Sequence, residues 1–312
     1  MFKQLLLTIG LGLLISSCGT NPYKESNKVY EQQLKVLQQK LAEKEAIALK
    51  KVETTTTSHD TLYTKQINTL KDSISKFNPT ALENVTTEWI GTVNFNLRKP
   101  NFVIIHHTAQ DSLKQTLKTF TLASTKVSAH YVIAEDGKVV QMLNDYLRGW
   151  HAGNGTWGRN SDINSASIGI ELDNNGSEPF SEAQINSLLA LLTKLKKDYN
   201  IPTQNFIGHS DIAPTRKVDP SALFPWQLLA EKGFGLWPEA QLETAPTDFN
   251  AEMALRIIGY DTKNLNAAIK AFKLHYIKTE IDSIIDQKTL NVIYAIYKKQ
   301  LYYSRSTEKI HA

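Results

Sequence analysis

The run Phe102-Val103-Ile104-Ile105-His106 places four apolar residues before a histidine, and it predicts a buried β-strand that ends in a polar side chain. On both sides of it, between residues 81 and 237, short apolar strands alternate with helical patterns. Strands and helices that alternate along a chain are typical of an α/β domain. We therefore expect one α/β domain over residues 81–237.

Neighbouring segments support this fold. Residues 131–134 and 139–143 predict the strands of a hairpin, because Glu135-Asp136-Gly137 between them supplies the turn. Residues 167–172 predict another strand. Ser181 to Gln184 form a capping box that opens a helix whose apolar face should pack on the sheet. That face holds Ile185, Leu188, Leu189, Leu192 and Leu195.

Two further regions follow the α/β domain. Residues 238–248 predict a linker, and residues 249–312 predict a helical domain. Helical patterns occur near residues 251–258, 266–276 and 286–303. Together they indicate a small C-terminal three-helix bundle.

The N-terminus predicts an export signal. Lys3 precedes an apolar run from Leu5 to Ile15, so we expect a signal peptide over residues 1–17. A transmembrane anchor is the alternative, but this run is shorter than the roughly 20 residues that span a bilayer. Ile15-Ser16-Ser17-Cys18 resembles a lipobox, and the resemblance implies that Cys18, the only cysteine of the chain, carries a lipid.

Residues 18–80 are too polar to build a core, and they predict a spacer between the lipid and the α/β domain. Within it, residues 30–51 favour a short amphipathic helix, with a partner-binding coiled coil as the alternative. The formal net charge of +4 is mild and no dense run of Lys and Arg occurs. Nucleic acid is therefore not an expected partner.

Two histidines and one aspartate have the context of metal ligands. His106 ends a strand, His209 follows the short apolar segment Phe206-Ile207-Gly208, and Asp219 comes ten residues later, after a loop that contains Pro214. A strand end projects a rigid side chain into a cleft, and such a loop can return a carboxylate to the same point. Two imidazoles and a carboxylate with an open fourth position form a catalytic zinc set.

Five segments carry a resemblance to one family, the type 2 N-acetylmuramoyl-L-alanine amidases, and within it to the AmiD-type lipoprotein amidases. The resemblance covers residues 81–237 and implies their fold, a central mixed β-sheet flanked by helices. The segments are Ile105-His106-His107-Thr108-Ala109, Ser128-Ala129-His130-Tyr131, Trp150-His151-Ala152-Gly153, Ile168-Gly169-Ile170-Glu171-Leu172 and the run from Gly208 to Pro220.

The resemblance implies that His106, His209 and Asp219 bind zinc. Consecutive strand residues point to opposite faces, so His106 and His107 cannot both face one metal ion without distortion. The family pattern selects His106, and His107 is expected to be structural. The same pattern favours Asp219 over Asp211, which is expected to organise its loop.

The remaining chemistry is assigned to two ionisable residues. Glu171, the one ionisable residue of its strand, is expected to take a proton from the attacking water and pass it to the leaving nitrogen. A surface glutamate on an edge strand is the alternative. Lys217, two residues before Asp219, is expected to stabilise the oxyanion of the intermediate. A solvent-facing lysine is the alternative there.

Substrate contacts are expected from His151, Trp150 and His130, with a spectator role as the alternative for His151. Trp150, Trp157 and Trp226 could form walls on which sugar rings stack, but buried aromatic packing is the default expectation for each. Residues 267–276 resemble a helix of peptidoglycan-binding domains, without visible chemistry.

The expected function is zinc-dependent hydrolysis of the amide bond between N-acetylmuramic acid, or its anhydro form, and L-alanine. The expected partners are peptidoglycan and, through Cys18, a membrane. We expect the periplasmic face of the outer membrane, because the residue after Cys18 is Gly19 rather than aspartate. The alternative functions are a non-catalytic recognition or tethering lipoprotein and an amidase for small soluble amides.

Overall fold

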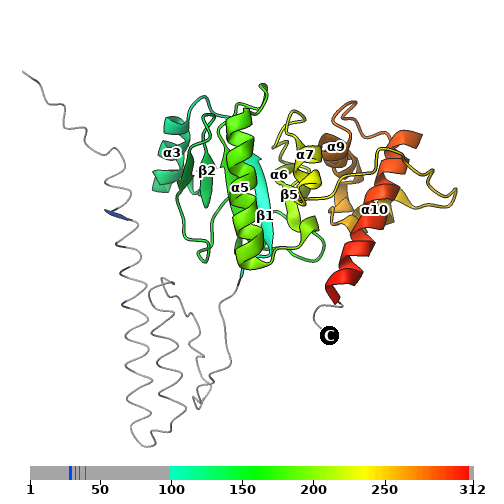
Figure 1. Ribbon diagram of the computed structural model, residues 1–312, viewed down its shortest axis with the longest axis horizontal. Coiled ribbons are helices and arrows are strands. Elements are labelled where there is room, and N and C mark those ends of the chain that lie inside the picture. Colours follow the sequence, from blue (N-terminus) through cyan, green and yellow to red (C-terminus); the bar gives the residue numbers. More distant parts are fainter. Residues whose placement is uncertain (1–27, 30–31, 33–34, 36–38, 40–98, 309–312) are drawn as a thin grey trace, which may run out of the picture.

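The computed structural model describes residues 28–29, 32, 35, 39 and 99–308 (Figure 1). The predicted signal peptide, Cys18 and the predicted start of the α/β domain at residue 81 lie outside the described residues, as does most of the spacer. Within the described residues, none of the helices combines the length and the apolar character that crossing a membrane requires.

A five-stranded mixed sheet forms the centre of the fold, in the order β3-β2-β4-β1-β5. β1 runs parallel to β4 and β5, and β2 runs parallel to β4, whereas β2 and β3 form the antiparallel hairpin. This confirms the expected mixed sheet flanked by helices. The strands are β1 (Phe102–His107), β2 (Tyr131–Ile133), β3 (Val139–Gln141), β4 (Ser167–Leu172) and β5 (Phe206–Gly208).

The helices divide into a long one on the sheet, short ones at its edges, and a C-terminal group (Figure 1). They are α3 (Leu113–Thr121), α4 (Ile163–Ala166), α5 (Glu182–Tyr199), α6 (His209–Ile212), α7 (Trp226–Glu231), α8 (Ala251–Ile258), α9 (Leu265–Tyr276) and α10 (Gln287–Glu308). The C-terminal group confirms the three predicted helices. The four short helices α3, α4, α6 and α7 were not predicted.

β1 is buried on both faces, and its residues alternate between two hydrophobic cores. Val103 and Ile105 pack in the core that α5 covers, whereas Phe102 and Ile104 belong to the core on the opposite face. His106 continues the alternation on the face of Ile104, because strand side chains repeat every two residues. The strand therefore directs His106 away from α5.

α5 forms as its sequence predicts. The Ser181 side chain accepts a hydrogen bond from the Gln184 backbone N–H at 3.0 Å, which caps the first turn. Leu188, Leu192 and Leu195 are fully buried against the sheet. The helix thus shields the sheet face on which His106 does not lie.

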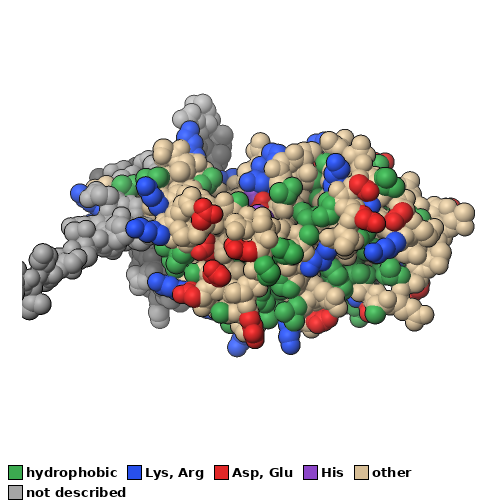
Figure 2. All heavy atoms as spheres, turned by 90° about the horizontal axis from the view of Figure 1, so that it is seen from above, with side chains coloured by type: hydrophobic (Ala, Val, Ile, Leu, Met, Phe, Trp, Pro, Cys, Tyr) green, Lys and Arg blue, Asp and Glu red, His purple; other side chains and the backbone are tan. Residues whose placement is uncertain are grey.

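The C-terminal helices cover the other face. Leu255 of α8 and Phe272 of α9 are fully buried in the same core as Ile104 of β1 and Ile207 of β5. Gly259 passes so close to Trp157 that a Cβ atom there would lie 2.3 Å from the indole. The helices beyond residues 238–248 are thus packed tightly onto the sheet. On the surface, acidic, basic and apolar side chains are interspersed (Figure 2).

Candidate metal centre

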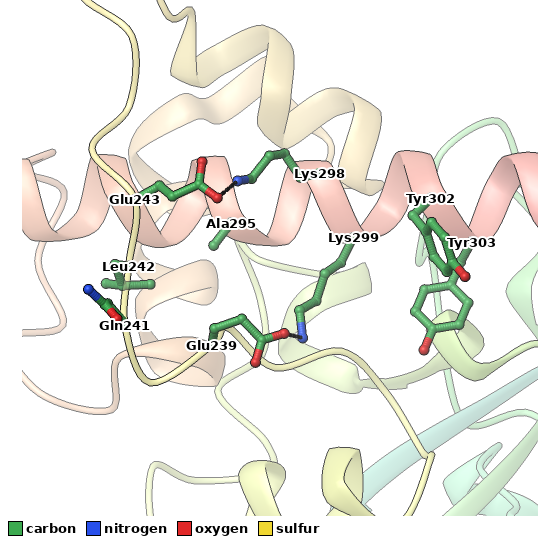
Figure 3. Close-up of a pocket in the computed structure, with 9 residues that line it drawn as sticks. All are labelled: Glu239, Gln241, Leu242, Glu243, Ala295, Lys298, Lys299, Tyr302 and Tyr303. Atoms are coloured by element: carbon green, nitrogen blue, oxygen red, sulfur yellow. Dashed lines mark ion pairs between the residues drawn. The ribbon is translucent and has the colours of Figure 1, made fainter.

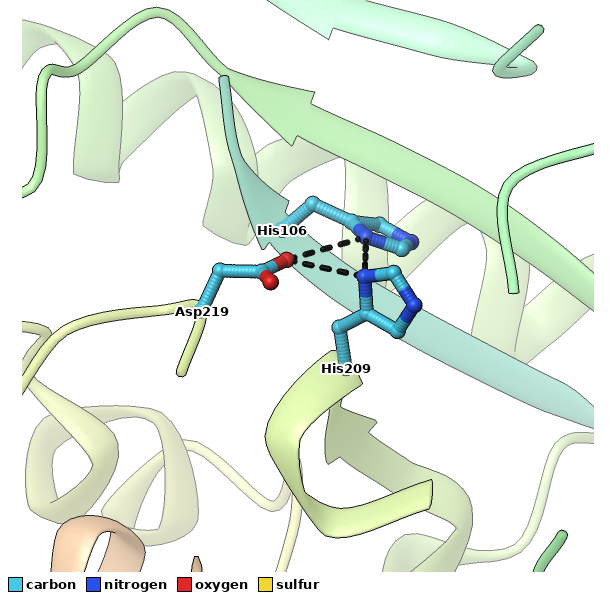
Figure 4. A group of neighbouring side chains, drawn as sticks. All are labelled: His106, His209 and Asp219. Atoms are coloured by element: carbon cyan, nitrogen blue, oxygen red, sulfur yellow. Dashed lines mark hydrogen bonds and ion pairs between the residues drawn. The ribbon is translucent and has the colours of Figure 1, made fainter. Parts of the chain in front are cut away.

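His106, His209 and Asp219 come together at one edge of the sheet (Figure 4). The Nδ1 atoms of the two histidines lie 2.8 Å apart, and Asp219 Oδ2 lies 3.2 Å from His106 Nδ1 and 3.0 Å from His209 Nδ1. The three side chains are at most 8% exposed. Two imidazole nitrogens and one carboxylate oxygen therefore converge on one buried point.

The topology explains this convergence. β1, β4 and β5 are parallel, so their carboxyl ends meet at the same edge of the sheet. His106 lies at the end of β1, and His209 begins α6 directly after β5. The loop after α6 brings back Asp219, whose carbonyl accepts a hydrogen bond from the Ser210 backbone N–H at 2.7 Å. Residues 103 positions apart in sequence are thus fixed side by side.

A chain of hydrogen bonds orients the ring of His106. Ser167 Oγ donates its hydrogen to the carbonyl of Ile163 at 2.6 Å, so at 3.3 Å it accepts from His151 Nε2. Burial holds the pKa of His151 well below its usual range, which keeps that ring neutral and leaves its Nδ1 as an acceptor. His106 Nε2, at 3.2 Å, therefore donates to His151 Nδ1.

The second imidazole is oriented in the same way. His209 Nε2 lies 3.4 Å from the carbonyl of Ala152, which can only accept a hydrogen bond. Burial, and then the neighbouring His209, lowers the pKa of His106 to about 4, so His106 is neutral at pH 7. With their hydrogens on Nε2, the rings of His106 and His209 turn their Nδ1 atoms toward each other and toward Asp219.

This donor set fits a divalent cation. Nitrogen lone pairs and a carboxylate oxygen repel one another at 2.8 to 3.2 Å, the separations of these three atoms, unless a positive charge lies between them. Donors around a tetrahedral ion with bonds of about 2.0 to 2.1 Å are about 3.3 Å apart, close to the observed separations. Metal-binding histidines also typically donate the other ring N–H to a protein acceptor, as both do here.

Glu171 lies beside this group without joining it. Its Oε1 atom is 4.0 Å from His106 Nδ1, and the residue is 9% exposed. Its other carboxylate oxygen, Oε2, is buried without a hydrogen-bond partner among the described residues. Burial, assisted by Asp219 and opposed by Lys217, raises the pKa of Glu171 to about 8. Such a carboxyl can exchange a proton near neutral pH.

Lys217 is half-buried in the loop that carries Asp219. Its backbone N–H donates to the Ala213 carbonyl at 3.0 Å, which closes a turn before the ligand. Its positive charge lowers the pKa of both His106 and Glu171. The ammonium is therefore electrostatically coupled to the centre.

The three residues predicted to contact substrate differ in their surroundings. Trp150 is 53% exposed, so the expectation of buried packing is wrong for it, whereas His151 is 8% exposed and lies behind His106. His130 is fully buried: its Nδ1 accepts from the Gly169 backbone N–H at 3.1 Å, and its Nε2 donates to the Leu147 carbonyl at 3.0 Å. This leaves neither nitrogen of His130 to bind a ligand.

His107, Trp157 and Trp226 lie outside the group of three candidate ligands. His107 points to the opposite face from His106, and its Nδ1 accepts a hydrogen bond from the Ser221 backbone N–H at 3.2 Å. Trp157 and Trp226 are buried in the cores, which confirms the expected packing. The role of each residue in catalysis stays a prediction.

Sequence reasoning missed two residues that hold the histidines. Ser167 starts the hydrogen-bond chain behind His151, and Gly169 provides room for it, since a Cβ atom there would lie 2.4 Å from His151 Cγ. A serine and a glycine in a buried strand are a signal of close approach by another group. Residues 167–172 carry this signal in Ser167 and Gly169.

A second hollow lies away from this centre, between residues 238–248 and α10 (Figure 3). Its volume of about 390 Å³ is within the range of small-molecule sites. However, its charged lining is already paired, Lys298 with Glu243 and Lys299 with Glu239. This groove carries no arrangement that suggests catalysis.

The known sequences that this chain resembles are N-acetylmuramoyl-L-alanine amidases. The profile of the N-acetylmuramoyl-L-alanine amidase family matches residues 96–222. N-acetylmuramoyl-L-alanine amidase AmiD of Escherichia coli (strain K12) is 34% identical over 229 residues, which are 63% of this chain and 82% of that protein. The 1,6-anhydro-N-acetylmuramyl-L-alanine amidase AmpD of Haemophilus influenzae is 39% identical over 103 residues, 33% of this chain and 56% of that protein.

Solved structures agree with the sequences. E. coli AmiD, in complex with the substrate anhydro-N-acetylmuramic acid-L-Ala-D-γ-Glu-L-Lys, superposes with a TM-score of 0.60 at 31% identity, over 70% of this chain and 96% of that one. AmpDh3 from Pseudomonas aeruginosa, in complex with anhydromuramic pentapeptide, superposes with a TM-score of 0.58 at 26% identity, over 71% and 99%.

Proposed function

The chain belongs to the N-acetylmuramoyl-L-alanine amidase family, and we propose that it performs the family's reaction with a zinc ion held by His106, His209 and Asp219. It is a peptidoglycan hydrolase. The bond that it cleaves joins the lactyl group of N-acetylmuramic acid, or of the anhydro form, to L-alanine of the stem peptide. The convergence of three donors within 3.2 Å carries the zinc assignment.

The composition of the donor set favours zinc over other ions. Imidazole together with one carboxylate suits zinc, whereas calcium and magnesium prefer sites built from oxygen alone. Three protein ligands leave one position open for a water molecule or the substrate. When bound in such a site, zinc lowers the pKa of water to about 7 and polarises the scissile carbonyl.

Glu171 is the proposed acid and base. Its unpartnered Oε2 atom accepts a proton from the attacking water and returns it to the nitrogen of L-alanine as the amide bond breaks. Amide nitrogen is a poor leaving group until it is protonated, so both transfers are needed. A carboxyl with a pKa of about 8 suits this exchange, because each form is within reach at neutral pH.

Two further residues have proposed roles around the substrate. Lys217 stabilises the oxyanion that forms when water adds to the carbonyl, since its charge already acts on Glu171. Trp150 is exposed at the end of the segment that places His151, and its indole offers a flat apolar wall for a sugar ring. His151 acts through His106 by fixing its ring, which is a positioning role.

Product analysis tests this function. Purified protein is incubated with anhydro-muropeptide and with intact muropeptide, and the masses of the products are measured. Release of a peptide that begins with L-alanine is expected, and chelation followed by zinc should abolish and then restore it. A protein that binds muropeptide in this assay without cleaving it would instead support the recognition or tethering alternative.

We also infer that the protein is anchored in the cell envelope by a lipid on Cys18. The lipobox-like run at residues 15–18 supports this. The periplasmic face of the outer membrane is the proposed location. Cys18→Ala should move the protein from the membrane fraction to the soluble fraction, and retention of that variant in membranes would contradict lipid anchoring.

A further inference from the structure

Asp211 is fully buried near the metal centre, although it is not one of the three ligands. Its Oδ2 atom accepts hydrogen bonds from the Gly208 backbone N–H and from His275 Nδ1, each at 2.7 Å. Its Oδ1 atom accepts from the Tyr260 hydroxyl at 2.5 Å. Tyr260 directly follows α8 and its glycine cap, and His275 lies in α9. Two of the three donors to Asp211 therefore come from the C-terminal helices.

The third donor fixes the backbone around a metal ligand. Gly208 is the residue before His209, and Asp211 is two residues after it, so the hydrogen bond between them closes the first turn of α6 around the ligand. The next residue, Ser210, donates its backbone N–H to the carbonyl of Asp219 at 2.7 Å. A shift of this turn would therefore displace two of the three ligands together.

The donors from the C-terminal helices are held firmly themselves. The ring of His275 stacks on Trp226, with centroids 3.9 Å apart and planes 17° from parallel. Trp226 also presses on the turn, because a Cβ atom on Gly208 would lie 3.1 Å from its ring. The ring of Tyr260 packs against Trp157 at 5.0 Å. The hydrogen bonds to Asp211 therefore come from two side chains, His275 and Tyr260, that are themselves packed against tryptophan rings.

We propose that the C-terminal helices position the metal ligand His209, with Tyr260 and His275 acting as positioning residues through Asp211. The proposal rests on the zinc site of the proposed function. It gives these helices a role in the catalytic domain itself, whether or not they also bind peptidoglycan. Physically, a buried carboxylate that loses a donor must find another or move, and either response shifts the turn that carries His209.

Two conservative variants and one control test the proposal. Tyr260→Phe removes one hydroxyl and keeps the ring. Asp211→Asn keeps the shape but replaces one of the two acceptor oxygens with an NH2 group, so it cannot accept hydrogen bonds from Gly208, His275 and Tyr260 together. Lys278→Met is the control, because Lys278 also bonds across this interface, and its partner is the carbonyl of Phe224, at 3.0 Å, rather than Asp211.

The dissociation constant for zinc is measured for each full-length protein by competition with a chelator at fixed pH, and thermal unfolding is measured on the zinc-free forms. We expect affinity to fall about tenfold or more in Asp211→Asn, and less in Tyr260→Phe, as for residues that orient metal ligands. Lys278→Met should bind zinc like the wild type. At saturating zinc, kcat should recover in both variants and KM should stay constant.

Wild-type zinc affinity in both variants, with lower thermal stability alone, would overturn the proposal, since the network would then be an ordinary interface. Equal losses of affinity in Lys278→Met would overturn it too. If Asp211→Asn fails to fold, Tyr260→Phe decides the question. A wild-type protein that binds no zinc would contradict the proposed function itself, and with it this inference. Failure of the proposed function is therefore distinguishable from failure of the positioning role alone.

Discussion

His106 and Glu171 are register partners on the parallel strands β1 and β4, so their side chains leave the same face of the sheet next to each other. Between them, His106 Nδ1 and Glu171 Oε1 are 4.0 Å apart. This spacing places a buried carboxyl beside the proposed zinc ligands and outside their group. The same two strands thus supply both a proposed metal ligand and the proposed proton carrier.

The ligand assignment predicts which histidine variants lose zinc. His209→Ala and Asp219→Ala each remove one of three donors, so zinc content should fall from about one ion per chain to a small fraction of that. His107→Ala should retain zinc, because His107 lies on the other face of β1. Metal analysis that finds zinc lost from His107→Ala and kept by His106→Ala would reverse the assignment of the two faces.

The hydrogen bonds behind His106 predict an effect of Ser167, which is not one of the three proposed ligands. Ser167→Ala leaves His151 Nε2 without its acceptor, so the ring of His151 is no longer held in the form that accepts from His106. Zinc affinity should fall by about tenfold, the lower end of the effects of such partners. Ser165→Ala is the matched control, because Ser165 is not part of this series of hydrogen bonds. Unchanged zinc affinity in Ser167→Ala would show that these hydrogen bonds do not influence zinc binding.

The proposed role of Lys217 predicts a loss in kcat. Lys217→Met should lower kcat by roughly 100- to 1,000-fold and change KM little, since the ammonium acts on charge that develops only in the transition state. Lys232→Met, at an exposed lysine, serves as the control for loss of one positive charge. A rise in KM at constant kcat would show that Lys217 binds the substrate instead.

Asp173 predicts a pH-dependent change in stability away from the metal centre. Burial raises its pKa above the usual value, and its Oδ1 atom has no hydrogen-bond partner among the described residues. A raised pKa means that ionised Asp173 destabilises the folded state above the unfolded pKa, and that the cost disappears on acidification. Asp173→Asn should therefore raise the melting temperature at pH 7, and this gain should vanish near pH 3.

The control for this prediction is Asp248→Asn, which removes the same charge from an exposed position. It corrects for the change in net charge on a chain that is already positive. An equal gain at pH 7 in both variants would mean that net charge, and not the burial of Asp173, determines the result.

Local pattern was enough to predict the strands and the contrast between His106 and His107. An apolar run with period two places successive side chains on opposite faces, and the cores on the two sides of β1 follow that alternation. The family resemblance then selected His106. The capping box at Ser181 likewise fixed the start of α5, because a cap depends only on residues three positions apart.

Contacts between distant segments were not predictable in this way. Asp211 and His275 are 64 residues apart, and no local period brings a helix of the C-terminal group to a buried carboxylate beside His209. His130 was expected near the substrate because it lies in a family segment, yet the backbone of β4 and Leu147 occupy its ring nitrogens. Short helices such as α6 escape prediction because four residues hold too little pattern.

Hydrolysis with Glu171 as the proton carrier is tested most directly by the steady-state kinetics of Glu171→Gln on muropeptide, measured together with its zinc content and its affinity for muropeptide. Glutamine keeps the size of the side chain and leaves the three ligands in place. We expect normal zinc content, nearly normal affinity for muropeptide, and a kcat lowered by about 100- to 10,000-fold. Release of L-alanyl peptide by Glu171→Gln at a rate close to that of the wild type would contradict this role.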